Sequence, residues 1–151
     1  MDALTELQAR HSSEDTVAAY TTMGTDIRAA ITTVAATTWV AQDKQSESGC
    51  GQPFSGVGAR SVILGNYSSA TPIFDEAWPS ALTAAQAIAT TYGFTTTITK
   101  VDEPANHQVR LVDPTLGAYI DIGTKVAAVY LSSTGCHLPA GSRPTGSSGV
   151  R

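Results

Sequence analysis

Residues 78–99 read WPSALTAAQAIATTYGFTTTIT, and the spacing of the apolar side chains changes at Gly93. Before Gly93, apolar residues recur every three or four positions, which predicts an amphipathic helix that opens at Trp78 and Pro79. After Gly93, apolar side chains alternate with threonines as far as Ile98, which predicts a strand with two distinct faces. The stretch therefore predicts a helix that ends at a glycine and passes directly into a sheet.

The alternation continues beyond residue 100 in three further segments, at 107–112, 118–122 and 126–131. Asp113-Pro114-Thr115-Leu116-Gly117 and Gly123-Thr124 separate these segments and have the composition of turns. Because the connections are short, neighbouring strands must run in opposite directions. We therefore expect residues 94–132 to form an antiparallel meander.

An earlier helix is predicted over residues 13–34, where one apolar stripe extends over about five turns. The stripe consists of Val17, Tyr20, Gly24, Ile27, Ile31 and Val34. Two short strands are expected at 37–41 and 60–65, with a polar loop at 42–51. The expected fold class is α+β, with two amphipathic helices on one face of a mainly antiparallel sheet of about five to six strands.

The length of 151 residues corresponds to one domain. We expect a flexible N-terminal segment at 1–12 and a single α+β domain at 13–138. Residues 139–151 are rich in Pro, Gly and Ser and are expected to be disordered.

Charged residues make up 15% of the chain and the formal net charge is −4, without any cluster of Lys or Arg. This composition argues against nucleic-acid binding, which needs grouped cations opposite the phosphates. No apolar run approaches the length of a spanning helix. The first residues also lack the basic region and apolar core of a secretory signal, so the chain is either cytosolic or has lost a targeting segment.

The two cysteines bear on that choice. Cys50 and Cys136 each lie beside a glycine at the edge of an expected element, and neither belongs to a CxxC pair of a zinc site. One structural disulfide is the simplest interpretation, and two buried free thiols are the alternative. A disulfide would favour an exported protein and would stabilise the fold by about 4–5 kcal/mol.

The order of these elements resembles a known family. The segment Ala89-Thr90-Thr91-Tyr92-Gly93-Phe94-Thr95-Thr96 and the segment Thr134-Gly135-Cys136-His137-Leu138-Pro139-Ala140-Gly141 are similar to the LppA-like lipoproteins of mycobacteria and related actinobacteria. The resemblance covers roughly residues 14–141 and rests on structural motifs. It implies a lipid-anchored envelope protein, processed at a cysteine upstream of residue 1, and it implies no assigned activity.

Catalytic patterns are weak throughout the chain. There is no G-x-S-x-G motif, and His11, His107 and His137 are scattered, as surface histidines usually are. The pairs Asp75-Glu76 and Asp102-Glu103 are interpreted as solvated turn residues. Gly56-Val57-Gly58 lacks the third glycine of a dinucleotide loop. We therefore predict no catalytic residue, no metal site and no cofactor.

Trp39, Tyr67, Phe74 and Trp78 are candidates for a groove that binds an apolar ligand, although both tryptophans could instead belong to the core. A threonine face on the first meander strand is a second candidate surface. The expected function is that of an extracytoplasmic binding or interaction domain without catalytic activity. Its partner would be a protein or an apolar ligand, and only a lipid anchor would hold it to the membrane. The alternatives are a purely structural or accessory envelope lipoprotein of phage or host origin, and a small hydrolase.

Overall fold

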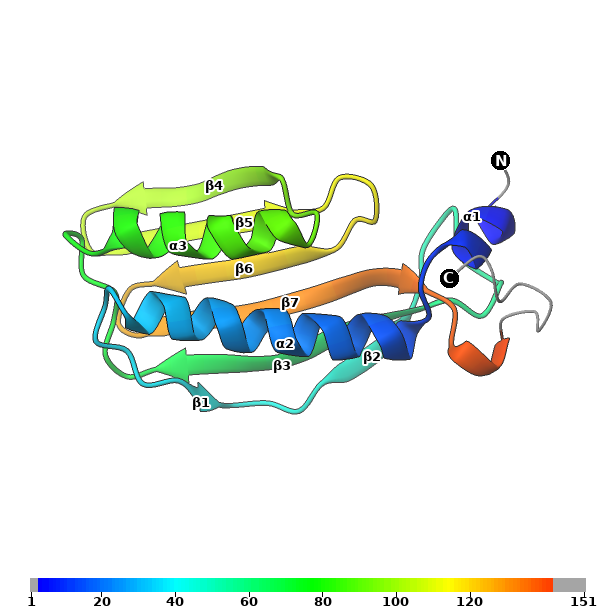
Figure 1. Ribbon diagram of the computed structural model, residues 1–151, viewed down its shortest axis with the longest axis horizontal. Helices are drawn as coiled ribbons and strands as arrows, with labels where there is room; N and C mark the ends of the chain where they lie inside the picture. The colour runs from blue at the N-terminus through cyan, green and yellow to red at the C-terminus, as the bar shows by residue number, and fades with distance from the viewer. Residues whose placement is uncertain (1–2, 143–151) are drawn as a thin grey trace.

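In the computed structural model, which describes residues 3–142, three α-helices and a seven-stranded sheet form two layers (Figure 1). The helices are α1 (Ala3–Ala9), α2 (Ser13–Thr32) and α3 (Trp78–Thr91). The strands are β1 (Val40–Ala41), β2 (Ser46–Gly49), β3 (Arg60–Ser69), β4 (Thr96–Glu103), β5 (Asn106–Val112), β6 (Tyr119–Thr124) and β7 (Ala128–His137). A short 3-10 turn follows at Ala140–Ser142. The predicted α+β class is confirmed.

The sheet is antiparallel throughout, in the order β1-β3-β7-β6-β5-β4, and β2 pairs with β3 further along the same edge as β1. Strands β4 to β7 are consecutive neighbours and form the meander that the alternating sequence predicts. Strand β3 joins the meander by pairing with β7. The first and second halves of the chain thus meet at the β3–β7 pair, with β1 and β2 on one side of it and β6, β5 and β4 on the other.

Both long helices lie side by side across one face of the sheet (Figure 1). Ile27 and Ile31 of the predicted stripe are fully buried, and so is Met23, which the stripe did not include. Val34 is 41% exposed because α2 ends at Thr32, so the predicted stripe is wrong at its last position. The strand register places Val109 beside Ile122 in the row that these helices cover. Burial of each large apolar side chain contributes about 1.5–3 kcal/mol to the free energy of unfolding, and this is the main source of stability.

The ends of the helices follow from local sequence. At the start of α2, the Ser12 hydroxyl accepts a hydrogen bond of 3.1 Å from the backbone N–H of Asp15. Helix α3 has Pro79 in its first turn, where the missing N–H has no helical partner to lose. Gly93 follows α3 with a φ of 98°, a left-handed conformation that favours glycine over other residues.

The prediction of a flexible segment at residues 1–12 is wrong for its described part. Residues 3–9 form α1, and Leu7 is fully buried against Ala59 and Leu138 in a second, smaller apolar cluster. This contact depends on residues more than 50 positions away, so no local pattern reveals it. Within the predicted tail, the backbone N–H of Ala140 donates to the Glu14 carboxylate at 2.9 Å, and residues 143–151 lie outside the described part.

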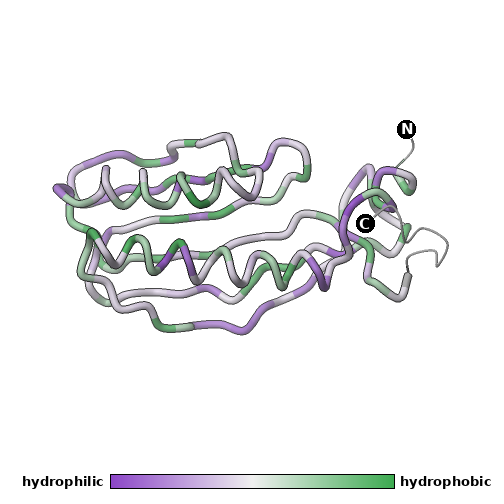
Figure 2. The backbone as a smooth tube through the Cα atoms, viewed as in Figure 1, coloured by the Kyte–Doolittle hydropathy of each residue, from purple (hydrophilic) through white to green (hydrophobic). Residues whose placement is uncertain are grey.

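The polar loop predicted at residues 42–51 contains strand β2, which pairs with residues 60–63 of β3. All four residues of β2 are exposed, so the sequence shows no alternation of apolar and polar side chains that would predict the strand. Figure 2 shows the hydrophilic character of the stretch that connects β1 and β2. Strand β2 accounts for the seventh strand, one more than the upper end of the predicted range.

Candidate functional site

Cys50 and Cys136 form a disulfide, with Cα atoms 6.2 Å apart and 86 positions between them in sequence. The predicted disulfide is confirmed. It connects the loop after β2 to the last residues of strand β7, and both cysteines pack against the cluster around Leu7. Phe54 and Val57, in the loop after Cys50, pack against the same cluster. The disulfide therefore holds together the end of the molecule at which α1 lies.

The four aromatic residues predicted to line a groove are distributed differently. Trp78 is buried and stacks on His107, with ring centroids 5.0 Å apart, whereas Phe74 is 56% exposed. Trp39 and Tyr67 are partly buried against the core. The main pockets of residues 3–142 are lined by at most one of the four, which is Tyr67. A groove shared by all four has no support in this arrangement.

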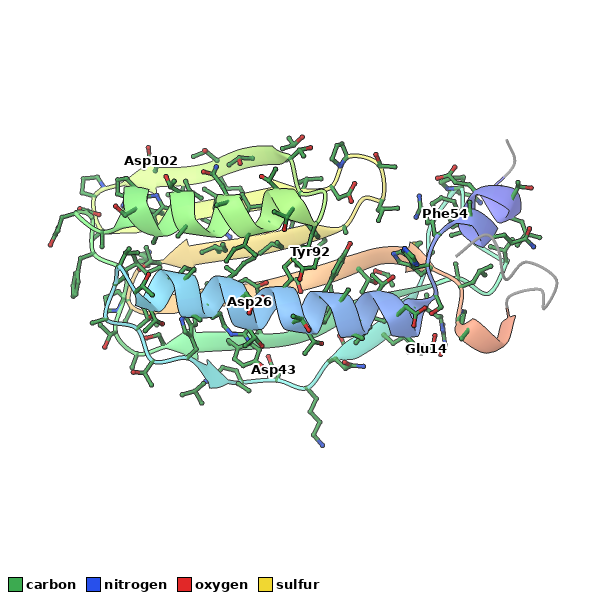
Figure 3. The ribbon with its side chains drawn as sticks, in the orientation of Figure 1. Glu14, Asp26, Asp43, Phe54, Tyr92 and Asp102 are labelled. Carbon is green, nitrogen blue, oxygen red and sulfur yellow. A yellow bond between two sulfur atoms is a disulfide. The ribbon has the colours of Figure 1, made fainter. Side chains whose placement is uncertain are left out.

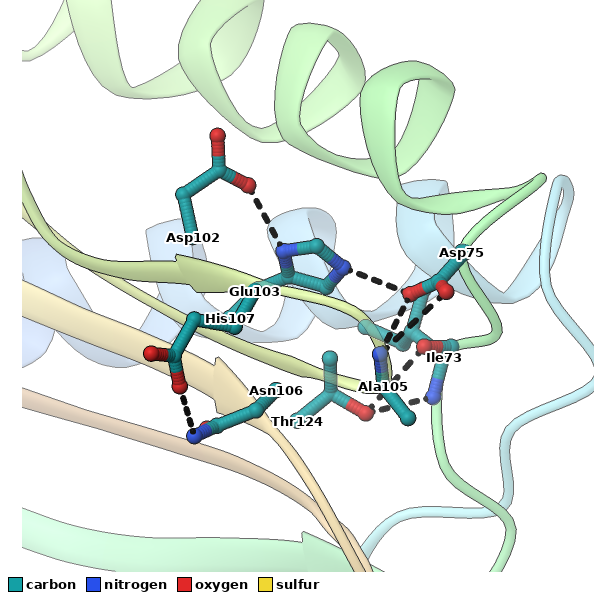
Figure 4. A network of polar contacts seen from close by, with 8 residues as sticks. All are labelled: Ile73, Asp75, Asp102, Glu103, Ala105, Asn106, His107 and Thr124. Carbon is teal, nitrogen blue, oxygen red and sulfur yellow. Dashed lines mark hydrogen bonds and ion pairs between the residues drawn. The ribbon is translucent and has the colours of Figure 1, made fainter.

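His107 at the start of β5 lies between two carboxylates (Figure 4). Its Nε2 is 2.7 Å from Asp75, in the connection before α3, and its Nδ1 is 2.9 Å from Asp102 on β4. Asp75 also accepts a hydrogen bond from the backbone N–H of Ala105, where the chain turns with a φ of 57°. The hydrogen bond from His107 holds the pKa of the Asp75 carboxyl below its usual value, with the Ala105 N–H as the next contributor.

Asp75 and Asp102 are exposed, as the sequence interpretation expects, but both also contact His107, and Asp102 lies on strand β4. Sequence reasoning could not find this network, because Asp75 is 32 positions from His107 and the contact depends on the fold. Both ring nitrogens of His107 are occupied, and its ring is covered by Trp78. The contacts connect the segment before α3 to strands β4 and β5. They also leave the imidazole without a nitrogen that could take a proton from a substrate.

A large pocket lies at the other end of the helical layer, beyond the end of α3. Its volume is about 940 Å³ and most of its surface is apolar. We call it the apolar groove, and it is lined by Glu6, Ala9, Arg10, His11, Asp15, Thr16, Ala19, Tyr20, Tyr92, Thr115, Leu116 and His137. Figure 3 labels Tyr92, which lies at the end of α3 on the side of α2. Five segments therefore meet there: α1, the first turns of α2, the end of α3, the β5–β6 turn and the end of β7.

His137 lies beneath the groove and is only 1% exposed, contrary to the expectation of a surface histidine. Its Nδ1 is 2.9 Å from the carbonyl of His11 and its Nε2 is 2.9 Å from the carbonyl of Thr134. Burial lowers the pKa of the ring, and this outweighs the two carbonyls, which favour the protonated form. The ring lies between the end of β7 and the residues that precede α2, and in its neutral form it donates a hydrogen bond to only one of the two carbonyls.

Arg10 forms one wall of the groove and is 8% exposed. Its guanidinium donates to the carbonyl of Cys136 at 2.9 Å and pairs with Glu6 at 2.7 Å. It also lies over the ring of Phe54, 4.8 Å from the centroid. These contacts neutralise a buried cation and keep the junction of α1 and α2 in place. Arg10 therefore shapes the groove and has little capacity left for a ligand.

Two further properties concern residues 3–142. No group of three or more His, Cys, Asp or Glu side chains in this part of the chain is arranged to hold a metal ion. None of the helices described there has the length and apolar character needed to cross a membrane.

Comparison with known proteins gives one family. Residues 1–140 match the LppA family, described as a lipoprotein confined to pathogenic Mycobacterium. The crystal structure of the lipoprotein LppA from Mycobacterium tuberculosis superposes with a TM-score of 0.75 at 16% identity, covering 90% of this chain and 83% of that one. A DUF4853 family protein from Actinomyces odontolyticus superposes with a TM-score of 0.56 at 15% identity, covering 87% and 71%. No curated protein matches the chain. At these identities the two structures indicate a shared fold.

Proposed function

The chain belongs to the LppA lipoprotein family, and we propose that it acts as an extracytoplasmic, lipid-anchored binding domain of the cell envelope without catalytic activity. The family supports the location, and the disulfide is compatible with an oxidising compartment. The proposed ligand is a small amphiphilic molecule held in the apolar groove. The observation that supports this most directly is the volume and apolar surface of the groove.

The size of the groove fits this class of ligand. A volume of about 940 Å³ falls within the range of roughly 300–1,000 Å³ that is typical of small-molecule sites. Tyr20, Tyr92 and Leu116 offer ring and aliphatic surface to a ligand. Burial of such surface would contribute about 25 cal/mol for each Å² removed from water. An aliphatic or aromatic body is therefore the part that the groove would hold.

The polar groups of the groove favour an uncharged head on the ligand. Glu6 and Asp15 line the groove with carboxylates, and Arg10 is already paired with Glu6 and with a backbone carbonyl. A ligand with its own carboxylate would meet repulsion that no free cation compensates. We therefore propose a neutral amphiphile, such as a molecule with hydroxyl groups on an acyl chain.

The absence of catalysis is part of the proposal and is supported by the two buried histidines. Both nitrogens of His107 face carboxylates, and both nitrogens of His137 face backbone carbonyls. A general base needs a nitrogen within hydrogen-bond reach of the substrate. Neither residue offers one.

A protein partner is the second candidate, and a different surface favours it. Val126 is 83% exposed and Val129 is 46% exposed, and both line a shallow pocket at the β6–β7 turn. Exposed aliphatic side chains grouped in this way are common in interaction sites. Val126→Asp would weaken the binding of a protein at this surface and would leave ligand binding in the apolar groove unchanged.

The groove is tested with N-phenyl-1-naphthylamine, an uncharged fluorescent probe, and with 1-monooleoylglycerol as competitor. Ala19 lines the groove, whereas its neighbour Ala18 is exposed and does not. We expect saturable probe fluorescence that the competitor displaces, lost in Ala19→Phe and retained in the matched Ala18→Phe. Equal binding by both variants would contradict the proposed site.

A further inference from the structure

Arg28 on α2 is a half-buried cation without a carboxylate partner. Its guanidinium lies 3.5 Å from the ring centroid of Tyr67 and 5.1 Å from that of Tyr130. Within residues 3–142 no ion pair involves Arg28. The aromatic faces attract the cation but accept none of its N–H groups in plane. Burial lowers the pKa of Arg28, as expected for a charge with incomplete compensation.

Tyr130 on β7 presents a second unpaired group at the same place. Its side chain is 2% exposed, and its buried hydroxyl forms no hydrogen bond of good geometry among the described residues, although Ser132 lies near enough to act on its pKa. A buried hydroxyl without a partner costs about 1–3 kcal/mol. Burial also raises the pKa of Tyr130, so the hydroxyl keeps its proton and remains a donor.

Gly24 allows these two groups to approach the backbone of α2 closely. A Cβ at this position would lie 2.9 Å from Nη1 of Arg28 and 3.2 Å from the hydroxyl of Tyr130. Glycine inside a helix costs roughly 1 kcal/mol relative to alanine, so this close approach is maintained at a cost to stability. Gly24, Arg28 and Tyr130 line a pocket of about 250 Å³.

We infer that this pocket binds the carboxylate of a small organic acid, with Arg28 and the Tyr130 hydroxyl as its donors. A guanidinium donates in a planar fork that matches the two oxygens of a carboxylate, and the hydroxyl supplies a further donor. Tyr20 and Leu64 also line the pocket and would contact a short apolar body attached to the carboxylate. The site is separate from the apolar groove, although Tyr20 borders both.

The charges around the pocket favour a single negative charge over a phosphate. Asp43 lines the pocket and is held there by a hydrogen bond of 2.7 Å from Asn66. A dianion would meet this carboxylate with only one cation to compensate it. Because Asp43 already offsets the charge of Arg28, a bound monocarboxylate would leave one negative charge uncompensated, whereas a dianion would leave two. The net charge of −4 also disfavours the approach of a dianion.

The test is a titration of the isotope-labelled protein, followed by amide chemical shifts, with benzoate, benzamide and phosphate as separate probes. Benzamide has the shape of benzoate without its charge. We expect saturable shifts at Gly24, Arg28 and Tyr130 with benzoate, and affinities at least tenfold weaker with the other two. Equal binding of benzamide, tighter binding of phosphate, or no saturable shift with benzoate would overturn the inference.

Variants assign the binding to these residues. Tyr130→Phe keeps the ring in the core and removes only the hydroxyl, and we expect roughly tenfold weaker benzoate binding. Gly24→Ala fills the space between the two donors and should abolish binding. Arg110→Gln is the matched control, because that guanidinium pairs with Asp121 and lies outside the pocket. Unchanged affinity in Tyr130→Phe, with a native spectrum, would refute the assignment.

Discussion

The carboxylate of Asp75 lies 2.7 Å from Nε2 of His107, and this contact connects the segment before α3 to the β4–β5 hairpin. The imidazole is enclosed by Trp78 on one face and by a second carboxylate, Asp102, at its other nitrogen. The position of α3 on the sheet therefore depends on a polar contact as well as on apolar packing. At the opposite end of the helical layer, the apolar groove is framed by a different histidine, His137.

The Asp75–His107 contact makes stability depend on pH in the acid range. The pKa of Asp75 is lowered in the folded state, so its contribution is present above the ordinary value of 3.8 and is lost as the pH falls through the folded pKa. We expect Asp75→Asn to be less stable than the native protein at pH 7, and the difference to disappear in acid. Urea unfolding over a pH series measures it.

Glu76→Gln is the control for that series, because Glu76 is the exposed neighbour of Asp75 and has no contact with His107. Its unfolding free energy should follow the native curve. A constant difference between Asp75→Asn and the native protein at every pH would show that the carboxylate charge does not matter.

His137 predicts a second pH dependence, in a higher range. Its folded pKa is lowered below the ordinary value of 6.5 by burial, so the unfolded chain takes up the proton first. Its contribution is therefore complete above pH 6.5 and is lost as the pH falls through the folded pKa. We expect His137→Gln to remove this slope. His11→Gln, in an exposed side chain, should retain it, and loss of the slope in both would contradict the assignment.

The disulfide predicts a large effect on stability. Replacing both Cys50 and Cys136 by serine removes a link across 86 positions, which corresponds to about 4 kcal/mol on the chain-entropy account. Unfolding of the double variant in urea measures this loss. Alkylation of the unreduced protein should modify no thiol, and two modified cysteines would contradict the pairing.

Two isoleucines of the predicted helix faces differ in burial and should differ in their effect. Ile27 on α2 is fully buried, whereas Ile88 on α3 is only partly buried. We expect Ile27→Ala to lower the unfolding free energy by about 2–5 kcal/mol and Ile88→Ala to lower it by less. The reverse order would show that α3, and not α2, makes the tighter contact with the sheet.

The parts of the fold that were predictable from sequence are those with a repeating local pattern. The stripe around Ile27 and the alternation in β5 each report which side chains face the core. The alternation after Gly93 correctly predicts a strand but not a buried face, because β4 is exposed along almost its whole length and Ile98 is 46% exposed. Strand β2 is polar and fully exposed, so it has no such pattern. Helix α1 is short, and only the distant contacts of Leu7 explain its place.

The candidate sites were hidden for a related reason. The groove, the His107 network and the Arg28 pocket each combine residues from segments far apart in the chain. The spacing of residues in the sequence does not predict such contacts. One signal was present. Gly24 is the one residue of the apolar stripe of α2 without a side chain, and a glycine inside a helix often marks a place where another group approaches closely.

The central claim is that the apolar groove binds a neutral amphiphile. Nuclear Overhauser contacts between unlabelled 1-monooleoylglycerol and the labelled methyl groups of the protein test it most directly. The account predicts contacts from the acyl chain to Ala9, Ala19 and Leu116, which line the groove. Contacts confined to Val126 and Val129, or no contacts to any methyl group, would contradict it.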